Sequence, residues 1–256
     1  MRAIILAGGR GKRLRPLTDY IAKPLLPIKG KPIIQQIIEN LSAANLKDIV
    51  IVVGYLGHQI RDYLGSGESA GVTIKYLEQK EQLGMAHALN IARDFINGDC
   101  LVAASDSIFP VQHIKKLIDF HISEKCDATI TLKKLESIEE ITHCSNVKLE
   151  KDFSITRIIE KPMNHQIISN ISGSPLYIFK EVIKEYLPKV EKSQRQEYEI
   201  QSAIQAMIDD GLVVKGILND SWIHLSTMED YSIADCEIYN RMPLWNHFAL
   251  LLIGIP

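Results

Sequence analysis

Hydrophobic residues in the first 104 positions gather in four short runs, with patterns of helical period between them. The runs are rich in isoleucine and valine and cover residues 3–6, 49–53, 72–77 and 100–104. Pro32 stands where the first residue of a helix is expected, and two further helices are expected over residues 84–96 and 111–123. Buried strands that alternate with amphipathic helices predict an α/β fold, a Rossmann-like, mostly parallel sheet with helices on both faces.

Beyond about residue 128 the pattern becomes richer in strands. Segments of strand character cover residues 129–135, 146–150, 155–160 and 175–179, and helices are expected near residues 197–210 and 228–241. We expect this half to complete the sheet and to add the second wall of a cleft, within one domain that spans residues 1–241. An apolar tail follows at residues 242–256, and the pattern does not decide whether it is a packed segment, a remnant of a further domain or a sticky end.

Charge is nearly balanced over the chain but uneven along it. The formal net charge of -2 argues against a nucleic acid partner, because domains that bind long polyanions carry a clear basic excess. Residues 1–31 nevertheless contain eight lysines and arginines and a single acid, Asp19. This asymmetry indicates a small anionic ligand near the start of the chain.

The cysteines argue against a metal or disulfide-based protein, and the apolar segments argue against a membrane protein. Four cysteines lie far apart, without the spacing of a metal site or a CxxC pair: Cys100, Cys126, Cys144 and Cys236. The chain starts directly with a strand pattern, and the last apolar run is far shorter than the ~20 residues that a membrane span needs. We therefore expect a cytoplasmic protein with no membrane partner and reduced thiols. Its oligomeric state is not predicted by these patterns.

A glycine-rich loop follows the first strand. Gly8, Gly9 and Gly11 are spaced so that bare backbone can approach a ligand, and successive backbone N-H groups in such a loop bind anions. Four bases lie within it: Arg10, Lys12, Arg13 and Arg15. No GxxxxGK sequence occurs, and Leu14 stands where a dinucleotide-binding fingerprint needs its third glycine. The loop predicts a ligand with several phosphates, and the simpler alternative is a glycine turn with solvated bases.

This loop, residues 6–18, together with residues 23–34 resembles the signature of the sugar-1-phosphate nucleotidyltransferases, such as glucose-1-phosphate thymidylyl- and uridylyltransferases. The resemblance continues in order to about Tyr231. It implies the nucleotide-diphospho-sugar transferase type of fold and an enzyme that uses an NTP and a sugar 1-phosphate. It further implies catalytic roles for Arg13, Lys23 and Asp106 and nucleotide contacts for Leu6, Ala7, Gly8, Gly9 and Gly11.

Residues 78–89 resemble the segment in which a glutamine and a glycine of the family contact the base. Gln79 and Gly84 match best, and Gln82 is a competing assignment for the glutamine. A side-chain amide offers a donor and an acceptor, which suits the imide edge of uracil or thymine, so UTP or dTTP is favoured. The alternative for either glutamine is a solvated loop position.

Asp106 follows the strand-like run at residues 100–104 and matches the family's metal-binding aspartate, with Ser105 in place of the usual glycine. An aspartate at the carboxyl end of a parallel strand faces the ligand crevice, where Mg2+ bridging phosphates needs oxygen ligands. The resemblance thus implies Mg2+ as cofactor, with Mn2+ as an alternative. A helix cap is the simpler interpretation, although the next helix begins some residues later.

The sugar side of the site is implied by a second set of residues. Glu160 and Lys161, in an EKP sequence, match positions that hold sugar hydroxyls and lie near the phosphates, and Tyr177 is assigned to the substrate with them. A surface salt bridge is the alternative for the EKP pair. Glu197 and Tyr198 resemble the next acidic segment of the family, although an acid at a helix start explains Glu197 nearly as well.

Four further positions depart from the family pattern, and they cluster on the sugar side. His224 replaces a second metal-binding aspartate, and Ser226, Asn146 and Pro175 replace glycines. His224 is assigned as a metal ligand, with a hydrogen bond to a neighbouring loop as an equal alternative. The leading functional hypothesis is nucleotidyl transfer to a sugar 1-phosphate. Its alternatives are a nucleotide or NDP-sugar binding protein with weakened catalysis, and a guanylyl- or cytidylyltransferase that acts on another small phosphate.

Overall fold

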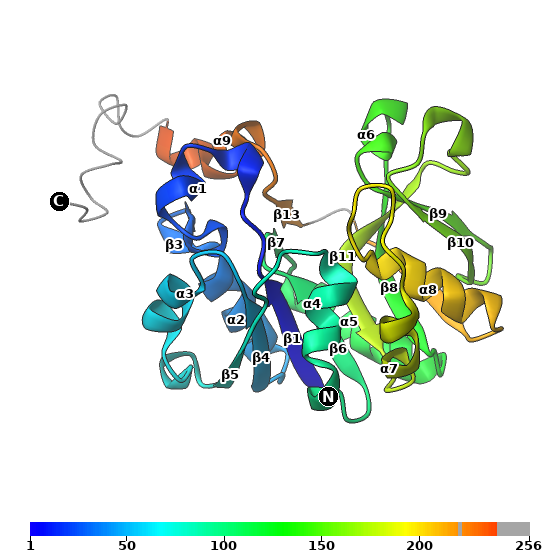
Figure 1. Ribbon diagram of the computed structural model, residues 1–256, viewed down its shortest axis with the longest axis horizontal. Helices are drawn as coiled ribbons and strands as arrows, with labels where there is room; N and C mark the ends of the chain where they lie inside the picture. The colour runs from blue at the N-terminus through cyan, green and yellow to red at the C-terminus, as the bar shows by residue number, and fades with distance from the viewer. Residues whose placement is uncertain (220–221, 240–256) are drawn as a thin grey trace.

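The computed structural model describes residues 1–219 and 222–239, and the tail expected at 242–256 lies outside them (Figure 1). A nine-stranded sheet runs through the molecule in the order β10-β9-β11-β6-β1-β4-β5, while β8 pairs with β11 and β12. In the described part of the chain no helix is long and apolar enough to cross a membrane. The α/β architecture predicted from the hydrophobic pattern is confirmed.

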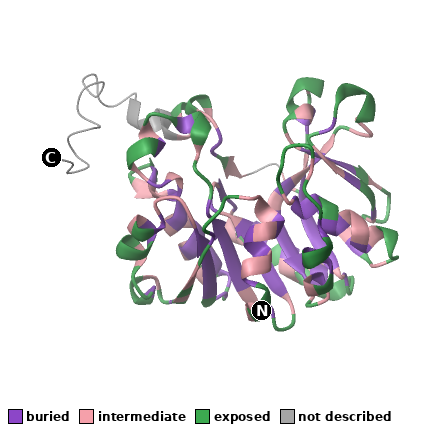
Figure 2. Cartoon of the chain, viewed as in Figure 1, coloured by how far each residue is buried: buried purple, intermediate pink, exposed green. Residues whose placement is uncertain are grey.

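The N-terminal part of the sheet is parallel. β1 (Arg2–Ala7) lies between β4 (Asp48–Val53) and β6 (Cys100–Ala104), and β5 (Thr73–Glu78) pairs with β4 at the edge. All three inner strands are almost entirely buried (Figure 2), as continuous apolar runs require when both faces of a sheet are covered. The four runs read from the sequence are therefore the four parallel strands, within one or two residues at each end.

Helices cover both faces of this sheet (Figure 1). One hydrophobic cluster joins alternate residues of the strands to α2 (Ile33–Ala43), α3 (Gly57–Leu64) and α5 (Val111–Ser123). The other cluster joins the intervening residues to α4 (Met85–Ile91), α7 (Ile183–Tyr186) and α8 (Ile200–Asp209). Two predicted boundaries were wrong. Pro32 precedes α2 rather than starting it, and the helix expected over 84–96 ends at Ile91, followed by a 3-10 turn at Arg93–Phe95.

The second half of the chain extends the sheet mainly by antiparallel pairing. β11 (Ile171–Phe179) runs antiparallel to β6, β8 (Ala128–Lys134) and β9 (Ser145–Leu149), and β9 pairs in the same way with β10 (Ile155–Glu160). β12 (Val214–Leu218) is parallel to β8. The strands β9 and β10 rise above the main sheet with α6 (Ile138–Thr142) and form a second wall opposite the N-terminal loop (Figure 1). The expected two-walled arrangement is thus observed.

Short elements complete the fold near the upper edge of the sheet. β7 (Ser107–Ile108) pairs with β13 (Ile223–His224), and β2 (Pro27–Ile28) pairs with β3 (Lys31–Pro32). α1 (Leu17–Tyr20) and α9 (Met228–Tyr239) lie together above the N-terminal half (Figure 1). The remaining 3-10 turns are Lys12–Leu14, Lys23–Leu25, Glu68–Ala70, Asn164–Gln166 and Leu187–Lys189. The β7–β13 pair carries the C-terminal segment back across the end of β6.

Candidate functional site

The glycine loop begins where β1 ends, at the carboxyl edge of the parallel strands. Gly11 has a φ of 63°, in the left-handed region that favours glycine, and a Cβ there would press on the side chains of Thr18 and Lys23. The Thr18 hydroxyl donates to the Gly11 carbonyl at 2.8 Å, and the Leu14 side chain is fully buried beneath the turn. The loop is therefore fixed from Gly11 onward, while Gly9, which precedes these contacts, is exposed.

The residues expected to hold the base meet beside this loop. Gln79 follows β5, is only 4% exposed, and lies so close to Gly8 that a Cβ on that glycine would overlap Oε1 of Gln79. Gln79 Nε2 donates to the Gly84 carbonyl at 3.2 Å. Gly84 has a φ of 105°, and a Cβ there would collide with the backbone of Tyr198. Gly8 is thus required by its contact with the Gln79 amide, and Gly84 by its positive φ and its contact with the Tyr198 backbone.

The competing assignment, Gln82, has a different environment. Its side chain is exposed and its Nε2 donates to the backbone carbonyls of Gln79 at 3.3 Å and Lys80 at 3.4 Å. Those bonds tie down the loop between β5 and α4. The structure therefore places Gln79, and not Gln82, against the glycine loop.

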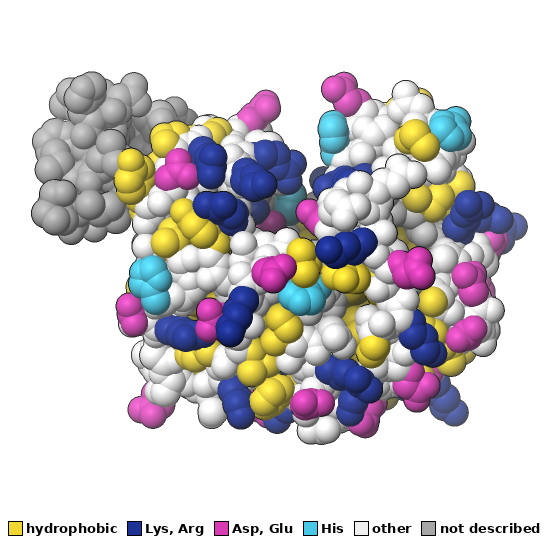
Figure 3. Space-filling model, viewed as in Figure 1, with side chains coloured by type: hydrophobic (Ala, Val, Ile, Leu, Met, Phe, Trp, Pro, Cys, Tyr) yellow, Lys and Arg dark blue, Asp and Glu magenta, His cyan; other side chains and the backbone are white. Residues whose placement is uncertain are grey.

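Basic side chains line the N-terminal wall of a hollow in the molecular surface (Figure 3). Arg13 and Lys12 are exposed, and no ion pair within the described residues engages Arg13. Arg10 packs its guanidinium 4.5 Å from the ring centroid of Tyr55. Arg13 therefore retains a cation that is free to bind an anionic ligand near the glycine loop.

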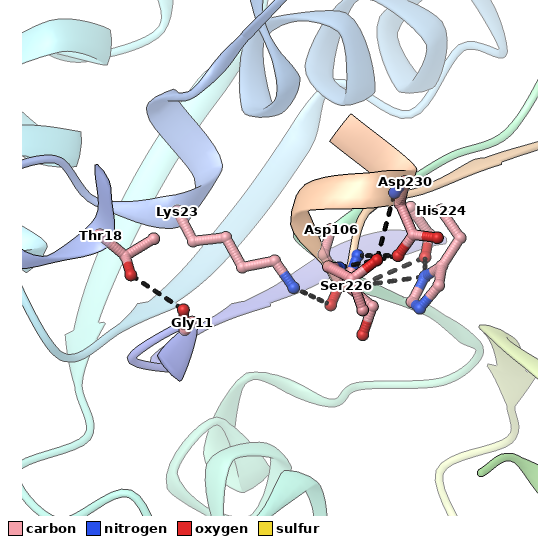
Figure 4. A network of polar contacts seen from close by, with 9 residues as sticks. Gly11, Thr18, Lys23, Asp106, His224, Ser226 and Asp230 are labelled. Atoms are coloured by element: carbon pink, nitrogen blue, oxygen red, sulfur yellow. Dashed lines mark hydrogen bonds and ion pairs between the residues drawn. The ribbon is translucent and has the colours of Figure 1, made fainter. Parts of the chain in front are cut away.

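Lys23 and Asp106 form an ion pair on the floor of the site (Figure 4). Lys23 Nζ lies 2.7 Å from Oδ2 of Asp106, and the Ser107 hydroxyl donates to Oδ1 at 3.2 Å. Burial alone would raise the pKa of Asp106. The charges of Lys23 and His224 and the hydrogen bonds outweigh it and lower the pKa to about 2. Asp106 is thus a carboxylate across the physiological pH range.

His224 reaches the same carboxylate from the C-terminal segment (Figure 4). It pairs with Ser107 across the β7–β13 ladder, its Nδ1 lies 2.9 Å from the Ser107 hydroxyl, and Nδ1 is 3.9 Å from Oδ1 of Asp106. The next residues are held as a helix start, because the backbone N-H groups of Ser226 and Thr227 both donate to Asp230 at 2.8 Å. His224 therefore makes the hydrogen bond to a neighbouring element and also lies beside Asp106, while its role as a metal ligand stays a prediction.

The donor set for a metal is small. Across residues 1–219 and 222–239, His, Cys, Asp and Glu side chains form no group of three or more that could hold a metal ion by themselves. Asp106 offers one carboxylate, and one of its oxygens is already paired with Lys23. His224 offers a ring nitrogen, and its side chain is 44% exposed. Mg2+ in phosphate-transferring sites is commonly held by one or two carboxylates plus substrate phosphates. The residues fit an ion that arrives with its phosphate ligand.

The opposite wall carries an acidic cluster that the sequence pattern did not reveal. Arg195 lies 3.5 Å from Glu160 and 2.7 Å from Glu199, and the two carboxylate side chains are 16% and 9% exposed. Burial raises the pKa of Glu160 to about 7, against the opposing charges of Lys161 and Arg195. Glu197, chosen from the resemblance, is exposed, whereas Glu199 is buried and shares the Arg195 guanidinium with Glu160. The spacing of four residues between Arg195 and Glu199 is the sequence feature from which this ion pair could have been predicted.

Two of the substrate residues named from the sequence have contrasting environments. Lys161 is exposed, with a φ of 45° and its backbone N-H bonded to the Cys144 carbonyl at 2.9 Å. Tyr177 is 2% exposed, and its hydroxyl accepts a 3.4 Å bond from Gln201. Burial, and then the charges of Glu160 and Asp106, raise the pKa of Tyr177. Tyr177 is therefore buried close enough to feel the charges of both carboxylates, and its assignment to the substrate stays a prediction.

The departures at Asn146 and Pro175 have structural consequences. Asn146 is fully buried, donates to the carbonyls of Ser169 and Ile171 at 2.9 Å each, and accepts from the Ile168 N-H at 2.8 Å. It therefore fastens the segment before β11. Pro175 lies within β11 where the pairing register with β8 shifts, and an N-H is dispensable at such a bulge. Ser105 donates its backbone N-H to Leu6 at 3.1 Å, across the ends of β6 and β1.

Comparison with known proteins agrees with this arrangement. Residues 2–241 match the family model described as nucleotidyl transferase. The low-salt glycan biosynthesis nucleotidyltransferase Agl11 of Haloferax volcanii is 30% identical over 223 residues, which cover 87% of this chain and 61% of that protein. The UTP--glucose-1-phosphate uridylyltransferase AglF of the same organism is 33% identical over 223 residues, covering 87% of this chain and 89% of that protein.

Solved structures agree on the fold. A crystal structure of UDP-glucose pyrophosphorylase complexed with UDP-glucose superimposes with a TM-score of 0.83, at 22% identity, over 94% of this chain and 99% of that one. The chain spans about three fifths of the length of Agl11 and most of the length of AglF. Together with the family match over nearly its whole length, these likenesses confirm the resemblance seen in the glycine loop. The chain belongs to the nucleotidyl transferase family, among the sugar-1-phosphate nucleotidyltransferases.

Proposed function

We propose that this chain transfers a nucleotidyl group from an NTP, with UTP or dTTP favoured, to a sugar 1-phosphate. A phosphate oxygen of the sugar attacks the α-phosphorus and forms a new P-O bond. The bond between the α-phosphorus and its bridging oxygen breaks, and the electron pair leaves with pyrophosphate. The observation that carries the proposal is the Lys23–Asp106 pair beside the glycine loop, which sets a cation and a carboxylate where phosphates would lie.

The residues supply position and charge rather than a nucleophile. Gly8 and Gly9 leave bare backbone against which a nucleotide can lie, and the ammonium of Lys23 and the guanidinium of Arg13 neutralise the triphosphate. Transfer at phosphorus through a charged transition state depends mainly on such neutralisation and on alignment of the reacting oxygens. We assign the exposed Lys161 to the phosphate of the incoming sugar and Glu160 to its hydroxyls.

Asp106 and His224 are the residues that would hold a divalent ion. A bound Mg2+ would supply positive charge next to the phosphates and compensate the charge that develops on pyrophosphate. The imidazole at position 224 is a softer ligand than a carboxylate and brings no negative charge, which favours Mn2+ relative to Mg2+. We therefore expect weak Mg2+ binding, and activity that is either low with Mg2+ or recovered preferentially with Mn2+.

A second candidate is a nucleotide or NDP-sugar binding protein with little turnover. The observation in its favour is that His224 stands where the resemblance implies a second carboxylate, so that Asp106 has an imidazole beside it instead. The candidates share the nucleotide side of the site and differ only in the chemical step. Binding without product therefore separates them.

The test is a pyrophosphate-release assay on the purified chain. Each of the four common NTPs and dTTP is combined with Mg2+ or Mn2+ and a panel of hexose and N-acetylhexosamine 1-phosphates, while nucleotide binding is followed by calorimetry. Pyrophosphate and an NDP-sugar are expected with UTP or dTTP. Tight nucleotide binding with no product for any pair would exclude the enzyme and leave the binding protein.

A further inference from the structure

The amide of Gln79 is already committed on its nitrogen side. A primary amide has two N-H groups, and Nε2 of Gln79 meets two acceptors, the Gly84 carbonyl at 3.2 Å and Nδ1 of His87 at 3.0 Å. The side chain is 4% exposed, so water has little access to it. This arrangement differs from the donor-and-acceptor pairing expected from the sequence, because both donors face the protein.

The oxygen of the same amide faces the nucleotide side. Among the described residues none donates a hydrogen bond to Oε1 of Gln79, which lies against Gly8 where a side chain on that residue would overlap it. The lack of a side chain on Gly8 therefore makes room for the oxygen at the glycine loop. Gln79 presents an acceptor, and only an acceptor, to whatever base lies on the loop.

His87 is held so that it can act as an acceptor for this amide. It occupies the first turn of α4, and its ring stacks on that of Tyr198 with centroids 6.0 Å apart and planes at 29°. The backbone N-H of the neighbouring Ala86 donates to the Tyr198 carbonyl at 3.0 Å, which fixes the start of the helix. An Nδ1 that accepts from Gln79 requires the neutral tautomer with its proton on Nε2.

We propose that His87 is a positioning residue for base selection, which holds the Gln79 oxygen toward the nucleotide. Uracil and thymine carry an N3-H, and guanine an N1-H, that can donate to this oxygen. Cytosine N3 and adenine N1 are acceptors and would oppose it. The inference rests on the proposed nucleotide site and deepens it, since it favours the uridylyl, thymidylyl and guanylyl hypotheses over the cytidylyl one.

Loss of the His87 acceptor should relax this selection. Without it, one N-H of Gln79 is left unpaired beside the helix, and turning the amide over then lets that N-H donate to cytosine N3. The Gly84 carbonyl still favours the original orientation, so the change is limited to the worth of about one hydrogen bond. We expect the preference for UTP over CTP to fall by roughly fivefold to tenfold.

The experiment compares the dissociation constants of UTP and CTP, measured by calorimetry with Mg2+, for wild type and three substitutions. His87→Phe keeps the ring on Tyr198 but removes the acceptor, and His87→Leu does the same with a smaller side chain in case the first fails to fold. His87→Asn restores an acceptor, because its Oδ1 can occupy the place of Nδ1. His58→Phe, at an exposed position on α3, is the matched control.

The expected result is a reduced UTP-to-CTP preference in His87→Phe and His87→Leu, and a preference within about twofold of wild type in His87→Asn and His58→Phe. Base preference is the informative readout, because a general loss of packing would weaken both nucleotides together. An unchanged UTP-to-CTP preference in the folded His87→Phe and His87→Leu variants would refute the role of His87 without refuting the proposed function. An equal loss of this preference in His87→Asn would have the same meaning. Failure of the folded wild-type chain to bind any nucleotide would instead refute the proposed function itself.

Discussion

Asp106 and Lys23 should depend on each other for both stability and catalysis. The two side chains are 25% and 12% exposed and meet at 2.7 Å, so water screens them poorly. We predict that Asp106→Asn and Lys23→Met each destabilise the fold at pH 7, and that the double variant costs little more than either one. Each single change leaves the remaining partner without its counter-charge.

The size of the effect follows from the pKa of Asp106. Burial acts against the carboxylate, but Lys23 and His224 prevail and lower the pKa from 3.8 to about 2. A shift of that size corresponds to about 2 kcal/mol of unfolding free energy. Because the folded pKa is depressed, this stabilisation is complete above about pH 4 and is lost as the pH falls toward about 2.

The assay is urea unfolding of the wild type and the three variants at pH 7 and at pH 3, followed by circular dichroism. A favourable coupling free energy between the two residues is expected at pH 7, with a smaller value at pH 3. Pyrophosphate release by Asp106→Asn should fall by at least about a hundredfold at saturating Mg2+. Additive single-variant effects, or a coupling free energy that does not change with pH, would refute the ion pair as its source.

Three further predictions concern the walls of the site. Gly8→Ala should weaken nucleotide binding at least about tenfold with a native circular dichroism spectrum, because the added Cβ displaces the Gln79 oxygen; unaltered affinity would argue against the contact. Burial raises the pKa of Glu160 from 4.5 to about 7, so its contribution to stability is complete below about pH 4.5 and is lost as the pH rises through 7. Glu160→Gln should therefore reduce the change in unfolding free energy between pH 5 and pH 7.5. An unchanged pH profile would show that another group causes this pH dependence. His224→Asp should tighten Mg2+ binding and speed turnover; coincident metal titrations of variant and wild type would show that position 224 does not contact the ion.

The sequence alone determined the parallel half of the sheet and the glycine loop. Continuous apolar runs and helical periodicity are local signals, so the four parallel strands β1, β4, β5 and β6 and the helix α5 were predicted within one or two residues, whereas the short strands β2 and β3 were not predicted. The spacing of the glycines predicted a loop of bare backbone, whereas the positive φ of Gly11 and the contact between Gly8 and Gln79 are found only in the structure. The less regular second half, where β11 pairs antiparallel on both sides, was read only as strands without their direction.

Tertiary structure decided which of these residues meet and which of their atoms are available. His224 is 118 residues from Asp106 along the chain, and only the pairing of β13 with β7 places them side by side. The acidic cluster at Glu160 and Arg195 likewise depends on packing between segments from different parts of the chain. The hydrogen-bond partners of Gln79 also depend on the tertiary structure. The sequence shows that its amide has two N-H groups, but only the structure shows that Gly84 and His87 accept both of them. Residue type sets what a side chain can do, whereas its neighbours in space set its charge, its orientation and the face that it offers to a ligand.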